Sequence, residues 1–306
     1  MFRFTFSRLA QAVASVLVVE VLVFFMSRIA GDPVNAMLPP EATAAERDAL
    51  RAQLGLDDPL VVQFLRFVRN TLTLDLGHSY SFNAPVSSLI FERLPNTVYL
   101  AVVAILLAAA IGVTVGVLGA RRPGSVIDIL GRGLAVIGQS VPTFVSGLLL
   151  ILVFAVTLRL VPSGGNRTWD SVVLPAITLA WFSTAALARI SRSSMLESLT
   201  AQYVTVARSK GLPERLILTR HALRNASTSI LSLGALQFVT LLNGAVITET
   251  VFNWPGIGQL IVQGAFSRDY PLLQGMVFLT AVTTIVINFL TDVLYVKIDP
   301  RVRATS

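Results

Sequence analysis

The chain alternates long apolar stretches with short polar segments. A membrane-spanning helix needs about 20 mostly apolar residues, and six stretches come close to or exceed that length. They cover residues 9–29, 97–120, 133–158, 171–188, 225–248 and 271–291. The first is longer than the ~7–15 apolar residues of a signal-peptide core, so we expect the protein to retain it. The pattern predicts an all-α integral membrane protein with six transmembrane helices.

The segment 31–95, between the first two stretches, has a different pattern. Apolar side chains recur there at helical spacing with polar side chains opposite them, which is typical of an amphipathic helix. The apolar positions are Val61, Phe64, Leu65, Val68 and Leu72, and the polar ones are Gln63, Arg66, Arg69 and Asn70. Such a helix lies on the membrane surface or packs on the helix bundle, or alternatively it faces the core of a small external cap. In both cases we expect 31–95 to be an ordered segment.

The basic residues are distributed unevenly between the short loops. The loops after the second and fourth stretches hold ten Lys or Arg, whereas the loops after the third and fifth hold three. Cytoplasmic loops of membrane proteins carry the excess of Lys and Arg. We therefore expect the first pair of loops and both termini to face the cytoplasm, and 31–95 to lie outside.

The composition agrees with a membrane protein. Charged residues make up 13% of the chain, about half of what a soluble domain carries, and the mean hydropathy is +0.73. The net charge of +7 is spread between the apolar stretches, so we expect membrane lipid and no nucleic acid as a partner. The chain has no cysteine, which excludes disulfides and thiolate chemistry.

The residues needed for several kinds of catalysis are absent from the sequence. A phosphate-binding loop needs Lys after Gly, but neither Lys210 nor Lys297 follows a glycine. The two histidines, His78 and His221, fall on opposite sides of the membrane in the expected topology. We therefore expect no catalytic residue, no metal site and no cofactor in this chain. A membrane-anchored enzyme is the weakest of the alternatives for its function.

A single acid, Glu20, interrupts the first apolar stretch. Ionisable residues inside a membrane often have a functional role, and a proton-coupled secondary transporter could use this carboxyl. The alternative is that Glu20 faces the helix bundle and bonds to a neighbouring helix, which is the interpretation we favour because one acid does not make a proton relay.

The fifth stretch is the most polar of the six. Gln237, Thr240 and Asn243 either line a transport pathway or make contacts between helices. In the second stretch, Gly112 and Gly116 have the spacing that lets two membrane helices approach closely. We expect these two glycines to mark a helix–helix contact.

The most basic loop, between the fourth and fifth stretches, is interrupted by glycine and proline. Residues 201–210 suit a helix, and Gly211 is a plausible stop because glycine tolerates the left-handed conformation. Pro213 and Glu214 suit the start of a second helix. Ala207 and Gly211, four residues apart, predict a low surface that another protein could approach. Alternatively, the charges of this loop only fix the topology.

This loop resembles the EAA loop of permease subunits in binding-protein-dependent ABC importers, in the version of the dipeptide and oligopeptide branch. The residues that match are Tyr203, Val204, Ala207, Arg208, Lys210, Gly211, Leu212, Glu214, Arg215, Arg220, His221, Ala222, Leu223, Arg224, Asn225 and Ala226. Gln202 stands where that version has an acid, and Ser229 where it has proline. Shorter matches to the same branch occur, in order, at 31–33, 54–59, 75–79, 92–97, 248–260, 268–275 and 299–303.

The resemblance covers the whole chain and implies a single transmembrane permease domain, 1–306, with the type I ABC importer fold. It implies that 189–228 is a coupling loop that docks on a separate ATP-binding subunit. The residues implied in docking are Tyr203, Ala207, Arg208, Lys210, Gly211, Leu212, Glu214, Arg215, His221 and Arg224. Those expected at the pathway or its external gate are Gln237, Thr240, Asn243, Trp254, Pro255 and Gly256. For the last three, an ordinary turn between helices is the alternative.

The partners and the location follow from the same resemblance. It implies a second homologous permease, two ATP-binding subunits that hold ATP and Mg²⁺, and an external solute-binding protein. The expected location is the bacterial or archaeal cytoplasmic membrane, and the expected cargo is a peptide or a related small solute.

Overall fold

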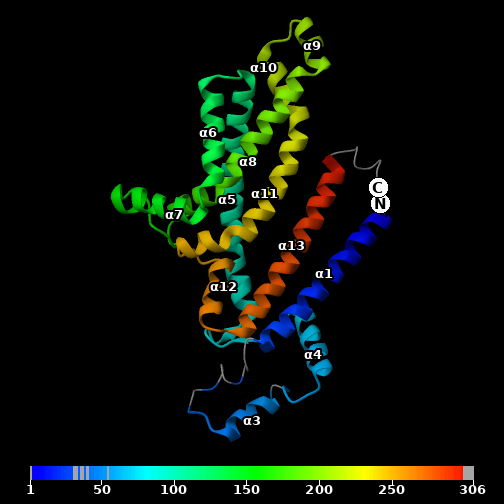
Figure 1. Ribbon diagram of the computed structural model, residues 1–306, viewed down its shortest axis with the longest axis vertical. Helices are drawn as coiled ribbons and strands as arrows, with labels where there is room; N and C mark the ends of the chain where they lie inside the picture. Colours follow the sequence, from blue (N-terminus) through cyan, green and yellow to red (C-terminus); the bar gives the residue numbers. More distant parts are fainter. Residues whose placement is uncertain (1, 30–33, 35–37, 39–40, 54, 299–306) are drawn as a thin grey trace. The chain divides into compact units, whose positions relative to one another are not determined.

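The computed structural model describes residues 2–29, 34, 38, 41–53 and 55–298, and this part of the chain is mostly helical (Figure 1). Two of the family matches, 31–33 and 299–303, lie outside the described residues. Leu54, the first residue of the match at 54–59, also lies outside them. The α-helices are α1 (Phe2–Ile29), α3 (Ala44–Gln53), α4 (Leu60–Leu72), α5 (Val86–Arg121), α6 (Val126–Ser140), α7 (Thr143–Leu150), α8 (Val173–Thr200), α9 (Gln202–Ser209), α10 (Glu214–Leu216), α11 (Leu223–Val251), α12 (Ile257–Phe266) and α13 (Tyr270–Ile298).

The remaining elements are short. Two π-helical turns, η1 (Ile151–Thr157) and η3 (Ile217–Ala222), and one 3₁₀ turn, η2 (Trp169–Val172), extend neighbouring helices. Strands β1 (His78–Ser79) and β2 (Ala84–Pro85) form an antiparallel pair, with His78 opposite Pro85.

The chain divides into two compact units. One contains residues 1–95 and 256–289, and the other contains 96–255 and 290–306. Helices α5 and α13 run from one unit into the other. The single domain 1–306 stays a prediction.

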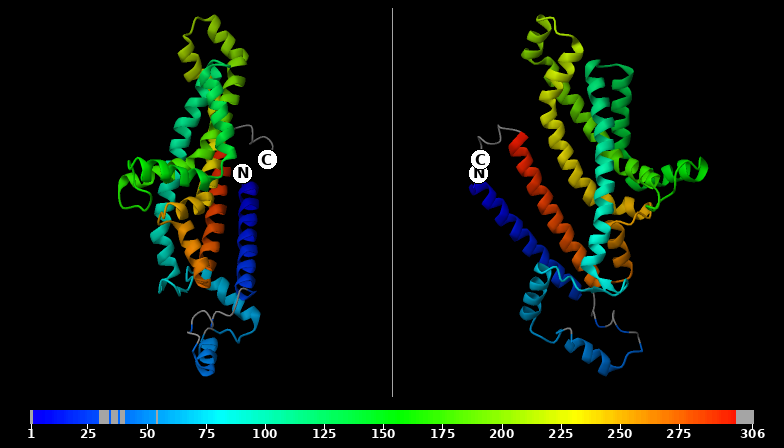
Figure 2. Two further views of the ribbon diagram at one scale, coloured as in Figure 1. Left: turned by 60° about the vertical axis from the view of Figure 1, so that its left-hand side comes forward. Right: turned by 180° about the vertical axis from the view of Figure 1, so that it is seen from behind.

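Helix α8 lies at the centre of the unit 96–255, between α11 on one side and α5 and α6 on the other (Figure 2). Two small residues of α5 allow the close approach. A Cβ added to Gly112 would lie 2.7 Å from the Thr184 carbonyl oxygen, and one added to Gly116 would lie 2.6 Å from that of Ala188. The predicted helix–helix contact at these glycines is therefore confirmed, and it packs α5 against α8.

Four helical segments are long and apolar enough to cross a membrane. They are Val86–Arg121, Trp169–Thr200, Glu214–Val251 and Tyr270–Ile287. A fifth is obtained if the bent pair α6 and α7–η1 forms one span. Helix α1 is continuous over 28 residues. The apolar part of its described residues, Val13–Phe25, is shorter than the length required of a membrane span. The six-helix count and the orientation of the termini remain predictions.

The third apolar stretch, predicted as one span, bends by 107° between α6 and α7. Val141 is extended, with φ −88° and ψ 122°, and Pro142 is the N-cap of α7. A proline disfavours the helical conformation of the residue before it, so the helix ends there and a new one begins. Figure 1 shows α7 running across the direction of α6.

The fifth stretch begins earlier than predicted. Helix α10, the turn η3 and α11 form one continuous segment, Glu214–Val251, of 38 residues. No proline follows Pro213 until Pro255, and no glycine occurs before Gly234, so nothing ends the helix at the membrane boundary. The second helix predicted for the basic loop is therefore the first part of the segment Glu214–Val251, which continues into α11.

The unit of 1–95 and 256–289 has its own core. Val86 and Ile90 of α5 pack with Leu260 of α12 and with Leu272 and Met276 of α13, and all five are at most 2% exposed. These contacts join the start of α5 to the α12–α13 hairpin.

The predicted amphipathic helix is confirmed as α4, although its packing face differs from the predicted one. Phe64 lies 5.2 Å from the ring of Phe24 on α1. Gln63, predicted on the polar face, is 9% exposed, and its amide donates to the carbonyl oxygens of Leu56 (2.8 Å) and Asp58 (2.7 Å). The apolar positions Val61, Leu65 and Leu72 are 69%, 62% and 73% exposed. An exposed apolar face of this kind suits a helix at a membrane surface.

Candidate functional site

The turn between α9 and α10 has a defined backbone geometry. Gly211 has φ +73°, which glycine adopts without the steric cost paid by other residues. The Gly211 N–H donates to the Arg208 carbonyl at 2.9 Å, and the Leu212 N–H donates to the Ala207 carbonyl at 3.3 Å. This pair of bonds is the Schellman arrangement that ends many helices. The predicted stop at Gly211 is confirmed, and Pro213 then caps α10.

A small apolar cluster lies beneath this turn. Val204 and Ala207 of α9 are buried against Ile217 of η3, and Leu212 packs against them. Ala207 is 5% exposed, so its small side chain serves packing inside the loop. This corrects the prediction that Ala207 and Gly211 together form a low outer surface. Gly211 alone is open, since a Cβ added there meets no atom of the described chain within 4 Å.

An ion pair joins the two sides of the turn. The Arg208 guanidinium donates to the Glu214 carboxylate at 2.8 Å, and the two side chains are 47% and 45% exposed. The hydrogen bond that Arg208 donates to Glu214 raises the pKa of Arg208 above its usual value. Exposed pairs contribute ~0–1 kcal/mol to the free energy of unfolding. This pair therefore links α9 to α10 but adds little to stability.

One face of α9 is exposed to solvent. Tyr203 is 39% and Val206 is 48% exposed, and Lys210 follows at the spacing that continues the same helical face. We call Tyr203, Val206, Lys210 and Gly211 the coupling face. Val206 was not among the predicted residues, although its spacing from Tyr203 and Lys210 could have identified it.

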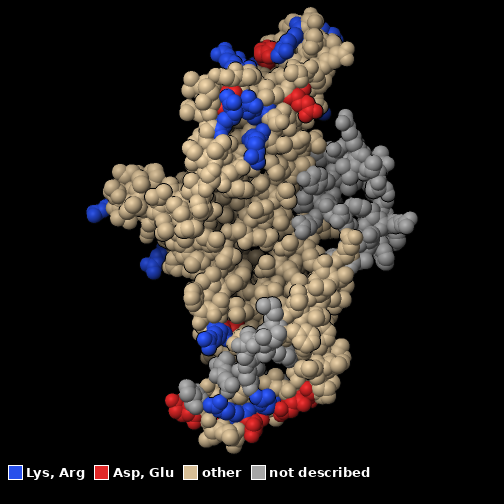
Figure 3. All heavy atoms as spheres, viewed as in Figure 1, with Lys and Arg blue, Asp and Glu red and all other residues tan. Residues whose placement is uncertain are grey.

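The other predicted docking residues surround this face. Arg215 and Arg224 are exposed, and His221 is half-buried. Figure 1 shows α9 and α10 beyond the ends of α5 and α6 within their unit, and Figure 3 shows basic side chains gathered at this end. The docking role of all these residues stays a prediction.

The polar residues of α11 face two directions. Gln237 is 7% exposed and accepts a hydrogen bond from the Ser183 hydroxyl of α8 at 2.9 Å, so it makes a helix–helix contact. Thr240 and Asn243 lie on the exposed face with Gly244 and Ile247. Of the three residues predicted to line a pathway, the structure places Thr240 and Asn243 on one accessible face, and Gln237 away from it.

Trp254 is buried at the end of α11, with 2% of its surface exposed. Its indole N–H donates to the Asn96 carbonyl at 3.1 Å, and the Asn96 amide donates to the Pro255 carbonyl at 2.8 Å. Nearby, the Thr97 hydroxyl donates to the buried Glu249 carboxylate at 2.6 Å. This geometry is that of a fixed turn between helices. Gly256 is the N-cap of α12, and a gate at 254–256 stays a prediction.

Two sequence profiles of one protein family match almost the entire chain. Residues 112–304 match the family described as "Binding-protein-dependent transport system inner membrane component", and residues 1–101 match its N-terminal part. The chain belongs to this family. The permease is 38% identical over 304 residues to the glutathione transport system permease protein GsiC of Salmonella paratyphi A, with 99% of both chains covered. It is also 38% identical to the oligopeptide transport system permease protein AppB of Bacillus subtilis, with 96% of this chain and 97% of that one covered.

Solved structures show the same fold. A chain of the MetNI methionine ABC transporter in an inward-facing conformation has a TM-score of 0.55 and 21% identity. The match covers 69% of the permease and 96% of that chain. The resemblance stated from the sequence is thus confirmed, and the protein is an ABC importer permease that works with ATPase subunits.

The comparisons do not support the alternative of a proton-coupled transporter using Glu20. In the structure, the Glu20 side chain is buried between α1 and α4, and the Thr71 hydroxyl lies 3.5 Å from one of its carboxylate oxygens. This agrees with the expected bond to a neighbouring helix.

Proposed function

We propose that this permease forms part of the translocation pathway of an importer for peptides or small peptide-like solutes. It works in a bacterial or archaeal cytoplasmic membrane with a second permease, two ATP-binding subunits and an external solute-binding protein. ATP and Mg²⁺ act on the ATP-binding subunits, and this chain carries no cofactor. The names of the relatives, which include glutathione and oligopeptide permeases, support this class of solute.

The observation that carries the proposal is the exposed coupling face on a rigid turn. Backbone bonds at Gly211 and the cluster around Ile217 fix the turn. An ATP-binding subunit that moves the turn also moves the start of Glu214–Val251, because the helix is continuous over 38 residues, or about 57 Å. The same helix carries Thr240 and Asn243 on its accessible face. A movement at the coupling face is thereby transmitted to the pathway.

The first prediction tests docking with Gly211→Trp. The indole projects from the open turn and blocks a partner surface. We expect ATP-dependent uptake of a labelled dipeptide into proteoliposomes containing all subunits to fall at least tenfold. Gly124→Trp is the matched control, because Gly124 also has positive φ (+80°) and open space around it among the described residues. Both variants carry the same backbone strain, of about 1–2 kcal/mol.

Control uptake should stay within about twofold of the wild type, and the ATP-binding subunits should co-purify with the control and not with Gly211→Trp. Normal uptake by Gly211→Trp would show that the turn does not couple. Uptake by the purified permease alone under a proton gradient would contradict the proposed importer. Calorimetry of the solute-binding protein with peptides and with glutathione tests the cargo, and binding of neither class would contradict the peptide assignment.

A further inference from the structure

Three neighbouring hollows lie along the unit 96–255, lined by α5, α6 and α8 and, at one end, by α7 and η1. A hollow of about 490 Å³ lies at the end that contains Arg132, Arg189 and Arg192. It shares lining residues, including Ala135, with a second hollow of about 270 Å³. The second shares Trp181 with a third of about 300 Å³. Neighbouring hollows share walls, and we call the three adjoining hollows the groove; the first hollow is its basic end.

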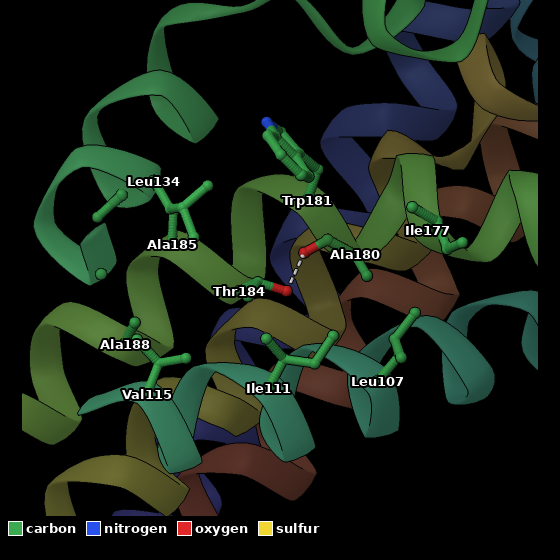
Figure 4. A pocket seen from close by; sticks show the side chains of 12 residues that line it. Leu107, Ile111, Val115, Leu134, Ile177, Ala180, Trp181, Thr184, Ala185 and Ala188 are labelled. Carbon is green, nitrogen blue, oxygen red and sulfur yellow. Dashed lines mark hydrogen bonds between the residues drawn. The ribbon is translucent and has the colours of Figure 1, made fainter. Parts of the chain in front are cut away.

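Beyond its basic end, the groove is lined by apolar side chains. Figure 4 shows Leu107 and Ile111 of α5, Leu134 of α6 and Trp181 of α8 around the second hollow. Leu134 is 52% exposed, so the side of the groove is accessible. The buried indole N–H of Trp181 has no hydrogen-bond partner within the described part of the chain. A polar solute would find this one N–H and otherwise apolar walls, so most of its bonds to water would be lost without replacement.

The basic end carries an excess of positive charge. Asp128 is 2% exposed, and both Arg192 (2.5 Å) and Arg132 (3.4 Å) contact its carboxylate. Arg189 donates instead to the Gln139 amide oxygen at 3.0 Å. The residues that line this hollow therefore carry three guanidinium groups and one carboxylate. Arg132 keeps 56% of its side chain exposed and can reach a further anion.

We propose that this groove binds an anionic phospholipid of the membrane. The phosphate lies between Arg132 and Arg189, and one acyl chain follows the apolar groove past Ala135 to Trp181. Basic pockets between membrane helices suit acidic lipid headgroups, and guanidinium groups bind phosphate in a bidentate manner. A helix of another subunit would satisfy the apolar walls but not the surplus charge. The inference depends on the membrane location and not on the solute carried.

The test uses the tryptophan at the far end of the groove. The purified transporter complex, in detergent, is titrated with phosphatidylglycerol or phosphatidylcholine brominated on the acyl chains. The signal of Trp181 is the difference in fluorescence quenching between the wild type and Trp181→Phe. We expect saturable quenching, with at least fivefold higher apparent affinity for phosphatidylglycerol, and no displacement by millimolar inorganic phosphate.

Two variants with matched controls locate the lipid. Arg132→Gln with Arg189→Gln should abolish the preference for phosphatidylglycerol, whereas Arg122→Gln, an exposed arginine outside the groove at the same end of the unit, should keep it. Ala135→Phe should block the quenching of Trp181. Leu130→Phe, on the same helix and 60% exposed, should leave the quenching unchanged.

Three results would overturn the proposal. Equal affinity for both lipids, unchanged by the arginine variants, would mean that only bulk lipid contacts this side. An absence of quenching in the assembled complex would mean that another subunit covers the groove. Displacement by millimolar inorganic phosphate would mean that the basic end binds any free anion and that the apolar walls contribute nothing to lipid binding.

Discussion

At the scale of single residues, Asp269 joins two motifs that are far apart in the sequence. Its side chain is fully buried and accepts hydrogen bonds from the Ser79 hydroxyl (2.6 Å), from the Ser81 N–H and hydroxyl (2.9 Å each), and from the Leu272 N–H (3.2 Å). Burial and the charge of Asp269 raise the pKa of Tyr80 to about 12. Tyr80 therefore stays protonated at physiological pH. One carboxylate thus holds the segment 79–81 against the start of α13.

The second prediction concerns this carboxylate. Asp269→Ala leaves two buried donors, the Ser79 hydroxyl and the Leu272 N–H, without this acceptor, each at a cost of about 1–3 kcal/mol. We expect a clear drop in the thermal unfolding temperature of the detergent-purified permease and faster proteolysis around residues 79–81. Asp75→Ala, which removes an exposed acid from the same segment, should change neither. Equal behaviour of the two variants would contradict the role assigned to Asp269.

The sequence marked both motifs as family matches but could not show that they meet. Ser79 and Asp269 are 190 residues apart, and a hydrogen bond between side chains leaves no periodic pattern. The same holds for Asn96 with Trp254 and for Asp128 with Arg192, which join different helices. In contrast, the turn at Gly211 was predictable because its bonds are local.

At the scale of elements, hydrophobic pattern and small-residue spacing predicted most helices and one contact. The contact at Gly112 and Gly116 was predictable because close packing of membrane helices needs small side chains at that spacing. The sequence shows a proline at position 142, but it does not show that the helix bends sharply there. A proline inside a membrane helix is often tolerated, as Pro95 is inside α5. Hydropathy cannot distinguish the two cases.

The third prediction tests the contact between α5 and α8. Gly116→Leu places a side chain where even a Cβ lies 2.6 Å from a carbonyl oxygen of α8. The helices must separate, which costs about 1–3 kcal/mol or more. We expect a lower unfolding temperature and less folded protein in membranes. Gly133→Leu is the control, because a Cβ at Gly133 in α6 meets no described atom within 4 Å. If both variants behave like the wild type, α5 and α8 do not pack as described.

At the scale of the whole molecule, the distribution of charge predicts which end faces the cytoplasm. The fold alone does not test this orientation, because no membrane is defined by the helices themselves. Nine of the eleven arginines of residues 96–255 lie within 121–132 and 189–224, which include the α5–α6 and α8–α11 connections and the adjoining helix ends. This supports a cytoplasmic position for the coupling face. The absence of cysteine from the chain makes the orientation easy to measure.

The fourth prediction uses single cysteines as reporters. Ser209 at the end of α9 and Ser163 in the loop after η1 are both exposed. We expect a membrane-impermeant maleimide to label Ser163→Cys in intact spheroplasts and Ser209→Cys only in inverted vesicles. Each variant is the control for the other. The reverse pattern would invert the predicted topology and move the coupling face to the wrong side for an ATP-binding subunit.

The π-helical turn η3 (Ile217–Ala222) sets the relative orientation of the coupling face and the accessible face of α11, which carries Thr240 and Asn243. A π turn accommodates one more residue than an α turn, so it rotates everything after it by about 100° relative to an uninterrupted α-helix. Loss or gain of one residue here would point Thr240 and Asn243 in a new direction while leaving every side chain of the coupling face unchanged. The number of residues between the two surfaces therefore fixes their relative orientation.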